Sequence, residues 1–385
     1  MIAFQISAPG RIILSGDYTS MYGKQVVAAS LNIRTKLTFF QLPQVSTIIK
    51  IEFPDVALSL DVPLEMIVNF ISNESYNIIV DDYILLLRHV KYFIILNGLS
   101  VSYEQRFSLQ IFFFLLFFIA RKEGLVINSF QVLLTTKLML KAGLGSSTSF
   151  ATCLAACFLH WACLQKGDHN EFTVEELTRI SEYVMYSEEV IQNYVYHEDY
   201  NVCTHGYVTA FCCTGMLNVQ SEHINAPEMN ILLIDANIRL DKSQQIKKLA
   251  AIRYSYGNAA DVLLDDIDNI SQGVVESLHL PRNDQGYVDL ELFLSVCETL
   301  EASFPLYQKF LRNLNLSHSN FDTICSIANM HGFEGKHAGE GTSYVIIMLR
   351  LNASINKIHN FMIHLQEEGF SSEVTSISCS GVQLE

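Results

Sequence analysis

The sequence predicts an α/β or α+β architecture built from two domains. Long apolar helical segments alternate with β-rich segments, which is typical of folds that pack helices on a sheet. The chain has 385 residues and half of them are apolar, so it can bury a large core. A single core stops growing at roughly 250–300 residues, and two domains are therefore expected. We place the boundary in the polar, proline-containing stretch 221–227, which gives domains 1–224 and 225–385.

Hydrophobic periodicity, glycine turns and capping signals predict the individual elements. Thr173-Val-Glu-Glu176 has the form of a capping box and predicts that a helix begins there. Residues 41–106 contain no motif that anchors a prediction. Expected strands lie at 2–7, 11–15, 26–40, 130–136, 230–236, 343–350 and 373–379, with a hairpin at 202–211 and 216–219. Expected helices lie at 108–122, 146–164, 173–193, 242–256, 258–270, 289–301, 319–330 and 354–367.

Composition and charge exclude several functional classes. Lys and Arg total 25 and Asp and Glu total 40, a net charge of −15, which argues against nucleic acid or an anionic membrane as partner. The longest apolar run, Ile111–Ala120, is too short to span a bilayer. The nine Cys are scattered without a CxxC pair, and the first residues lack the features of a signal peptide. We therefore expect reduced thiols and a cytoplasmic location.

A glycine loop between a predicted strand and a predicted helix is a candidate anion site. Gly143-Leu144-Gly145-Ser146-Ser147 lets the backbone approach a ligand, and the N–H groups of the first helical turn attract a phosphate. A simple capped turn would have the same sequence. The loop lacks the ending of a Walker A motif and fails as a Rossmann fingerprint. Two more glycine turns, at Ala8–Arg11 and 335–341, are weaker candidates.

One carboxylate is expected to lie on the buried face of a helix. Glu188 falls on the apolar stripe formed by Leu177, Ile180, Val184 and Ile191. A buried carboxylate needs a cation, several N–H donors or a metal ion as partner. A structural salt bridge would also satisfy it, and a helix that frays before residue 188 would leave it outside the core. Asp199, in the polar segment that follows, reads on its own as a solvated loop carboxylate.

Five segments of the chain, taken in order, resemble the GHMP kinase superfamily and, within it, the mevalonate kinases. The segments are Ser7–Asp17, Ser30–Thr35, the phosphate motif Ala142–Ser147, Leu314–His318 and Thr375–Val382. The likeness spans nearly the whole chain. It implies an α+β fold of two domains, with an N-terminal domain of ribosomal-S5-like type and a ferredoxin-like C-terminal domain, and an active site in the cleft between them.

The resemblance also implies a role for individual residues. Asp199 matches the catalytic aspartate, and Arg11 takes the place of the lysine beside it. Ser147 and Glu188 match the pair that holds Mg²⁺, and the loop from Gly143 to Ser147 would carry the nucleotide phosphates. Asn32 is expected near the nucleotide. Asp17, Tyr18 and Ala338 are expected near the substrate.

The implied reaction is phosphorylation of mevalonate by ATP to give 5-phosphomevalonate, an early step toward isoprenoids. A homodimer and inhibition by prenyl diphosphates are expected on the same basis. Other hypotheses are a kinase of the superfamily that acts on a sugar or an amino alcohol, and a non-catalytic relative that binds nucleotide or a prenyl ligand. A nicotinamide-dependent oxidoreductase is opposed by the failed fingerprint.

The chain departs from the family pattern at four places. Arg11 replaces a lysine, and Lys141 stands where the phosphate motif begins with Pro-Gly. The segment 194–198 replaces a small Pro- and Gly-containing turn. The segment 337–343 replaces a glycine run and brings in Glu340. A carboxylate near the phosphates repels a nucleotide unless it points away or binds a metal ion.

Overall fold

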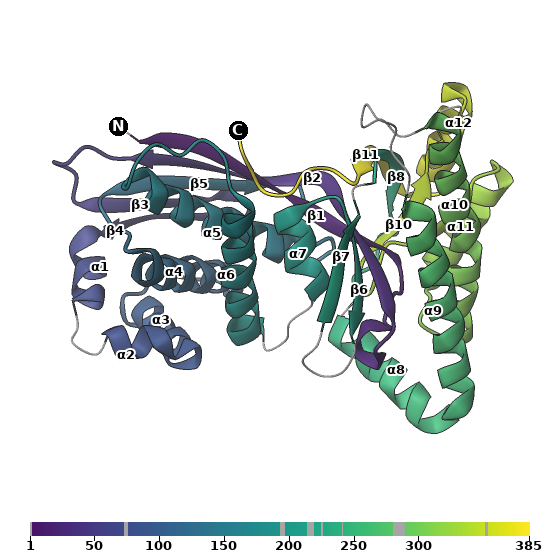
Figure 1. Cartoon of the computed structure of the whole chain (residues 1–385), viewed down its shortest axis with the longest axis horizontal. Helices are drawn as coiled ribbons and strands as arrows, with labels where there is room; N and C mark the ends of the chain where they lie inside the picture. Colours follow the sequence, from purple (N-terminus) through teal and green to yellow (C-terminus); the bar gives the residue numbers. More distant parts are fainter. Residues whose placement is uncertain are drawn as a thin grey trace.

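The strands of the protein form one continuous mixed sheet that runs through the molecule, with helices packed against it (Figure 1). The computed structural model describes residues 2–72, 76–192, 197–213, 219–224, 226–240, 242–279, 289–350 and 353–385, with the side chains at 21, 197, 198, 213 and 219 left out. The main strand order is β4-β3-β5-β2-β11-β8-β10-β9. This arrangement confirms the α+β prediction.

Two long antiparallel strands, β1 (Ala3–Ser15) and β2 (Gln25–Gln41), pair with each other along most of their length and lie at the centre of the sheet. The two strands expected at 2–7 and 11–15 are one strand, because the register shift at Pro9/Gly10 bends β1 without ending it. β3 (Ile48–Phe53), β4 (Leu58–Pro63) and β5 (Phe130–Thr136) extend this half of the sheet, and β3 pairs with β5 in parallel.

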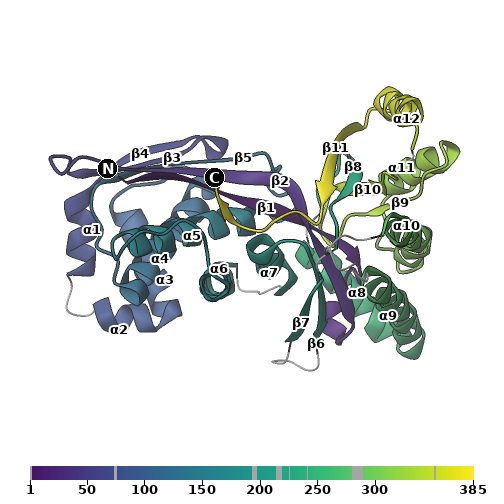
Figure 2. The same ribbon diagram turned by 45° about the horizontal axis from the view of Figure 1, so that its top comes forward.

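Helices cover one face of this half of the sheet (Figures 1 and 2). The unassigned stretch 41–106 contains β3, β4 and the first three helices, together with the short 3₁₀ helix η2 (Pro54–Val56); another, η1, is Ser20–Tyr22. The capping box at Thr173 is present: the Thr173 hydroxyl accepts from Glu176 N, and the Glu176 carboxylate accepts from Thr173 N. The helices are α1 (Leu64–Ile71), α2 (Tyr76–Asp81), α3 (Tyr83–Leu96), α4 (Tyr103–Glu123), α5 (Ser146–Leu164) and α6 (Val174–Gln192).

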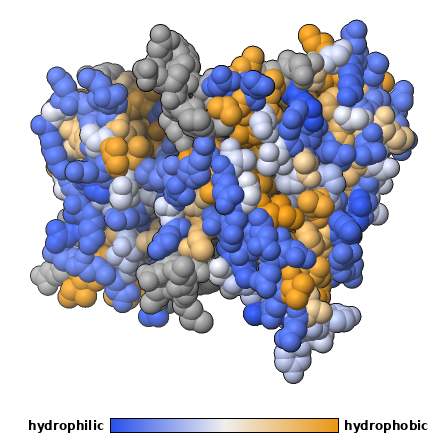
Figure 3. Space-filling view, turned by 45° about the vertical axis from the view of Figure 1, so that its right-hand side comes forward, coloured by the Kyte–Doolittle hydropathy of each residue, from blue (hydrophilic) through white to orange (hydrophobic). Residues whose placement is uncertain are grey.

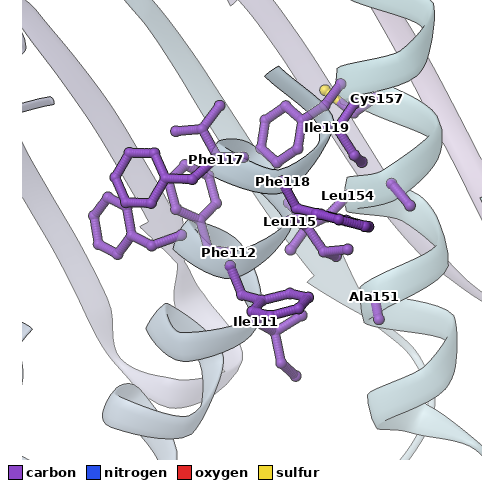
Figure 4. Close-up of a cluster of buried hydrophobic side chains, with 14 of the residues drawn as sticks. Ile111, Phe112, Leu115, Phe117, Phe118, Ile119, Ala151, Leu154 and Cys157 are labelled. Carbon is purple, nitrogen blue, oxygen red and sulfur yellow. The ribbon is translucent and has the colours of Figure 1, made fainter. Parts of the chain in front are cut away.

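The helices α4 and α5 form the centre of the first core. Phe112, Leu115 and Phe118 of α4 lie beside Leu154 and Cys157 of α5 (Figure 4). By length and composition both helices could cross a membrane, but 67% of the relevant window of α4 and 78% of that of α5 are buried in the protein. Burial on all sides explains their hydropathy. On the face shown in Figure 3, apolar residues are interspersed with polar ones.

The hairpin expected from residue 202 is partly a helix. Residues His197–His205 form α7, and the hairpin strands are β6 (Val208–Cys213) and β7 (Val219–Ile224). A short apolar run such as Val202-Cys203 fits a buried helix as well as a strand, so periodicity does not distinguish them. Gly206, with φ +77°, separates the two elements; a Cβ there would lie 2.1 Å from Gly381 N.

In the second half of the chain, the helices α8 to α12 pack around the other end of the sheet. The strands of this half are β8 (Met229–Asp235), β9 (Gly335–His337), β10 (Tyr344–Met348) and β11 (Ser371–Ile377). Its helices are α8 (Lys242–Tyr256), α9 (Asn258–Leu278), α10 (Leu290–Asn313), α11 (Ser319–Met330) and α12 (Ile355–Glu367). The helix expected at 289–301 continues through Pro305 to Asn313, because Phe304, Tyr307 and Leu311 are buried along it.

The end of the chain returns to the first half. β11 pairs with both β8 and β2, and β12 (Gln383–Leu384) pairs with β1. The Arg34 guanidinium donates to the carbonyls of Ser380 and Gly381 at 2.9 and 2.6 Å. The expected division at 224/225 stays a prediction, since one sheet joins the two parts.

Candidate active site

A pocket of about 380 Å³ lies where the glycine loop meets β1, α7 and the segment 339–343. Its polar end is lined by Arg11, Asp199, Lys242 and Glu340, together with Gly143, Gly145, Ser146 and Ser147 of the loop. Its apolar end is lined by Phe53, Val56, Tyr103, Phe107, Ile111, Leu134, Leu140 and Phe150. Six of the twelve residues that the sequence selected thus line one pocket, although they come from segments far apart in the chain.

Glycines shape the loop because backbone from another segment lies directly against it. Gly143 has φ +77°, and a Cβ at this position would lie 2.5 Å from the carbonyl oxygen of Gly341. Gly145, at φ +79°, is the N-cap of α5, and a Cβ there would touch the Arg11 side chain at 3.0 Å. Ser343 N also donates to Ala142 O. The first N–H groups of α5 therefore face the pocket in a fixed position, which suits an anion. Leu144 is buried under the loop.

Arg11 and Asp199 form a two-point ion pair at the polar end. Arg11 Nε donates to Asp199 Oδ1 at 2.5 Å and Nη2 donates to Oδ2 at 3.2 Å, while Nη1 donates to the carbonyl of Gly143 at 3.1 Å. Burial by itself raises the pKa of Asp199. The positive charges of Arg11 and Lys242 lower it by more than burial raises it, so the pKa lies below its usual value. The lowered pKa favours the ionised carboxylate, and the two hydrogen bonds fix its orientation relative to Arg11.

Glu188 is buried on α6, as the apolar stripe predicted. It accepts a hydrogen bond from the Thr148 hydroxyl at 2.5 Å and from Gln192 Nε2 at 3.4 Å. Burial, and next the nearby Asp199 carboxylate, raise the pKa of Glu188 to about 8. In α5, Glu188 thus contacts Thr148 and not the expected Ser147, which comes one residue earlier. Ser147 lines the pocket.

These residues fit a divalent cation. Lys242 and Arg11 lower the pKa of Glu188, but burial and the Asp199 carboxylate outweigh them, and a divalent cation would supply the further positive charge. Glu188, Asp199 and the Ser147 hydroxyl offer oxygen donors, which Mg²⁺ prefers. The pairing of Ser147 with Glu188 as ligands stays a prediction.

Glu340 faces the pocket, and its charge is compensated. Its carboxylate accepts from the backbone N–H of Tyr18 at 2.9 Å and lies 3.5 Å from Lys242 Nζ. Lys242 is the first residue of α8 and belongs to no motif, so no local pattern predicted its place in the site. A cation from the second half of the chain therefore offsets the additional carboxylate.

Asp17 and Tyr18, expected at the substrate, are buried beneath the segment 339–343 instead of lining the pocket. Asp17 lies 2.9 Å from Lys336 Nζ, and both side chains are fully buried. Burial raises the pKa of Asp17 to about 6 in spite of Lys336. Burial, followed by the charges of Glu340 and Asp17, raises the pKa of Tyr18 well above its usual value.

Two other expected residues lie outside this pocket. Asn32 is exposed on β2 between the buried Leu31 and Ile33, and it lines a separate polar pocket with Arg34 and Glu228. The alternation of side chains along a strand turns Asn32 to that face. Ala338 is fully buried, and its carbonyl accepts from Ile13 N at 2.9 Å, so it joins β1 to β9 rather than facing a ligand. The altered segment before Asp199 lies mostly outside the described residues.

Comparison with known proteins identifies relatives along the full length of the chain. No family model matches. Eight curated relatives, from an amoeba, fungi, mammals and a plant, are all named mevalonate kinase. The one from Dictyostelium discoideum is 26% identical over 403 residues, covering 99% of this chain and 96% of its own. The one from Bos taurus is 25% identical, with 98% and 94% covered.

Solved structures share the fold. The mevalonate kinase of Methanococcus jannaschii aligns with a TM-score of 0.63 and 16% identity, over 99% of each chain. A galactokinase from Lactococcus lactis aligns with a TM-score of 0.61 and 14% identity, over 99% of this chain and 94% of its own. The fold is thus that of kinases with different substrates, whereas the sequence relatives carry a single name. The chain is therefore similar over its full length to mevalonate kinases, which are phosphotransferases, and it shares the fold of the GHMP kinases.

Proposed function

We propose that the protein phosphorylates mevalonate, with ATP as the phosphoryl donor and Mg²⁺ on the nucleotide phosphates, in the route to isoprenoids. The observation that carries the proposal is the Arg11–Asp199 pair, fixed beside the glycine loop at one end of a pocket. The names of the full-length relatives support mevalonate as the acceptor.

The two ends of the pocket suit the two ends of a nucleotide. The N–H groups at the start of α5 would hold the β- and γ-phosphates, with Lys242 and Arg11 as the neighbouring cations. The apolar end, with Phe53, Phe107 and Phe150, has the chemistry to receive a purine ring. Ser147 and Glu188 would hold the metal ion, which when bound neutralises charge on the phosphates.

The transfer itself would need mostly positioning and charge compensation. The substrate hydroxyl oxygen attacks the γ-phosphorus, the bond to ADP breaks, and the hydroxyl proton passes to an Asp199 carboxylate oxygen. Asp199 with a lowered pKa is a weak base, so its main contribution is to orient the hydroxyl. Arg11, which also donates to Gly143 O, offsets charge that develops as the phosphoryl group moves.

A coupled assay of ADP release tests this proposal. Mevalonate, galactose and homoserine are each offered with ATP, with and without Mg²⁺. We expect Mg²⁺-dependent turnover with mevalonate. A preference for the sugar or the amino alcohol would reassign the substrate, and no turnover with any of them would indicate a non-catalytic relative.

The Asp199→Asn variant tests the assigned roles. It should lose at least about 10²-fold in turnover, because removal of a positioned acid or base costs roughly 10²–10⁴-fold, while it still binds nucleotide. Asp61→Asn, on the exposed surface of β4, is the matched control and should keep full activity. Near-normal turnover in Asp199→Asn would refute the role of Asp199. A dimer, inhibition by prenyl diphosphates and a cytoplasmic location stay predictions.

A further inference from the structure

A second group of metal-ligating side chains lies at the end of the α5–α6 pair that points away from the pocket. α5 starts at the glycine loop and runs for 19 residues, a length of about 28 Å. α6 runs back alongside it, so that Glu188 near its end reaches Thr148 near the start of α5. At the opposite end, Cys163 of α5, His169 of the connection and Glu176 of α6 come together, with their ligand atoms within 4.8 Å of one another.

The ligand atoms lie close enough together to share one zinc ion. Cys163 Sγ lies 3.5 Å from Glu176 Oε1, and His169 Nε2 lies 3.1 Å from the other carboxylate oxygen, Oε2. Tetrahedral angles with Zn–S of about 2.3 Å and Zn–N or Zn–O of about 2.0 Å place S and N about 3.5 Å and about 3.3 Å from a single oxygen, so the Glu176 carboxylate would rotate to turn one oxygen toward both ligands. Sulfur, imidazole and carboxylate are also the donor set that zinc takes in proteins.

Neighbouring groups already hold the ligands in place. The Glu176 carboxylate accepts from Thr173 N at 2.8 Å and from the Thr173 hydroxyl at 3.0 Å. His169 Nδ1 lies 2.6 Å from His160 Nδ1, and the His160 ring packs edge-on against Phe4 at 4.5 Å. A histidine that binds metal through Nε2 usually donates its Nδ1–H to a second group, and His160 is placed to accept that bond.

We propose that Cys163, His169 and Glu176 bind a zinc ion that ties the end of α5 to the start of α6, with His160 as a positioning residue for His169. On binding, the thiol proton leaves to solvent, His169 carries its remaining proton on Nδ1, and a water completes the tetrahedron. Thiolate and carboxylate then balance the charge of the ion. Arg179 Nη2, 3.7 Å from Glu176 Oε1, is the nearby cation, and Glu123 pairs with it at 2.7 Å.

Cobalt binding to the full-length protein, stripped of metal with a chelator, tests the site directly. Co²⁺ replaces zinc in such sites and gives a thiolate-to-metal charge-transfer band when a cysteine is bound. We expect this band, and we expect zinc to displace it and to raise the thermal unfolding midpoint progressively with concentration. The His160→Gln variant should weaken binding by about 10–100-fold without abolishing the band, because it alters only the group behind the ligand.

Two serine variants separate this site from the other thiols of the protein, one of which, Cys203, is buried close to Gly145 of the pocket. Cys163→Ser should lose both the band and the zinc-dependent shift. Cys212→Ser, at another partly buried thiol, should keep both. A wild-type protein without the band, or a band that persists in Cys163→Ser, would overturn the proposal. Because the readouts are spectroscopic and thermal, a failed kinase assay leaves this test unaffected.

Discussion

At the scale of single residues, three ion pairs lie in and around the pocket. Arg11 faces Asp199, Lys242 faces Glu340, and Lys336 faces Asp17. A buried ion that loses its partner costs several kcal/mol, whereas a pair replaced by apolar groups costs little. The pairs therefore fix where β1, α7 and the segment 336–343 lie relative to one another.

The Lys336→Met variant tests how much the stability of the fold depends on the ion pair between Lys336 and Asp17. It leaves Asp17 buried without its cation, so the pKa of Asp17 rises above its present value of about 6. An acid whose folded pKa is raised stabilises the fold fully below its unfolded pKa of 3.8, and this contribution is lost as pH rises through the folded pKa. We expect a loss of roughly 3–5 kcal/mol at pH 8 and a smaller loss at pH 5, measured by urea unfolding.

The double variant Asp17→Asn/Lys336→Met is the control for this prediction. It removes both charges, so most of the lost stability should return and the difference between the two pH values should shrink. Equal losses at pH 5 and pH 8 in the single variant would mean that packing around Lys336, and its hydrogen bonds to the carbonyls of Ile13 and His337, matter more than the charge of Asp17.

At the scale of the element, the glycine loop is a place where the two halves of the chain make direct backbone contact. Gly143→Ala puts a side chain at φ +77° and 2.5 Å from Gly341 O. A left-handed residue with a Cβ costs about 1–2 kcal/mol, and displacement of the backbone adds to this. We expect a loss of at least about 2 kcal/mol of stability and a clear loss of nucleotide affinity, read by urea unfolding and by calorimetry.

Gly273→Ala is the matched control for the loop. Gly273 lies in α9 with open space where its Cβ would be, so alanine should stabilise the helix by about 0.5–1 kcal/mol. Its nucleotide affinity should not change. If Gly143→Ala binds nucleotide as well as Gly273→Ala does, the loop tolerates displacement and its backbone does not position the phosphates.

At the scale of the whole molecule, the continuous sheet should make the two halves unfold together. β2 pairs with strands of both halves, and β12 returns to β1. The single tryptophan, Trp161, is fully buried in the core of the first half, so its fluorescence reports on that half. Circular dichroism reports on helices of both halves. We expect the two signals to give coincident urea transitions; separate transitions would show that the halves are independent.

Sequence reasoning predicted elements better where their patterns are local. The capping box fixed the start of α6, and the apolar stripe placed Glu188 inside. The prediction from sequence was wrong at α7, where a short apolar run fits a helix as well as a strand. No elements were predicted in the stretch 41–106, because it has no motif. Asn32 and Ala338 were expected at the site on the basis of resemblance, and the side-chain alternation of β2 and the burial of Ala338 place them elsewhere.

The sequence by itself determined an α/β or α+β architecture, the glycine loop, the inward carboxylate of α6 and the likeness to GHMP kinases, and that likeness in turn implied the α+β class. These follow from periodicity, turn chemistry and motifs, which depend on residues close together in the chain. The resemblance placed Arg11 beside Asp199, but only the tertiary structure showed that Lys242 meets Glu340 and that Lys336 meets Asp17. Such pairs join residues that are up to 319 positions apart in the chain, as Asp17 and Lys336 are (336 − 17 = 319). These residues meet only when the sheet forms, so no local sequence pattern predicts their contact.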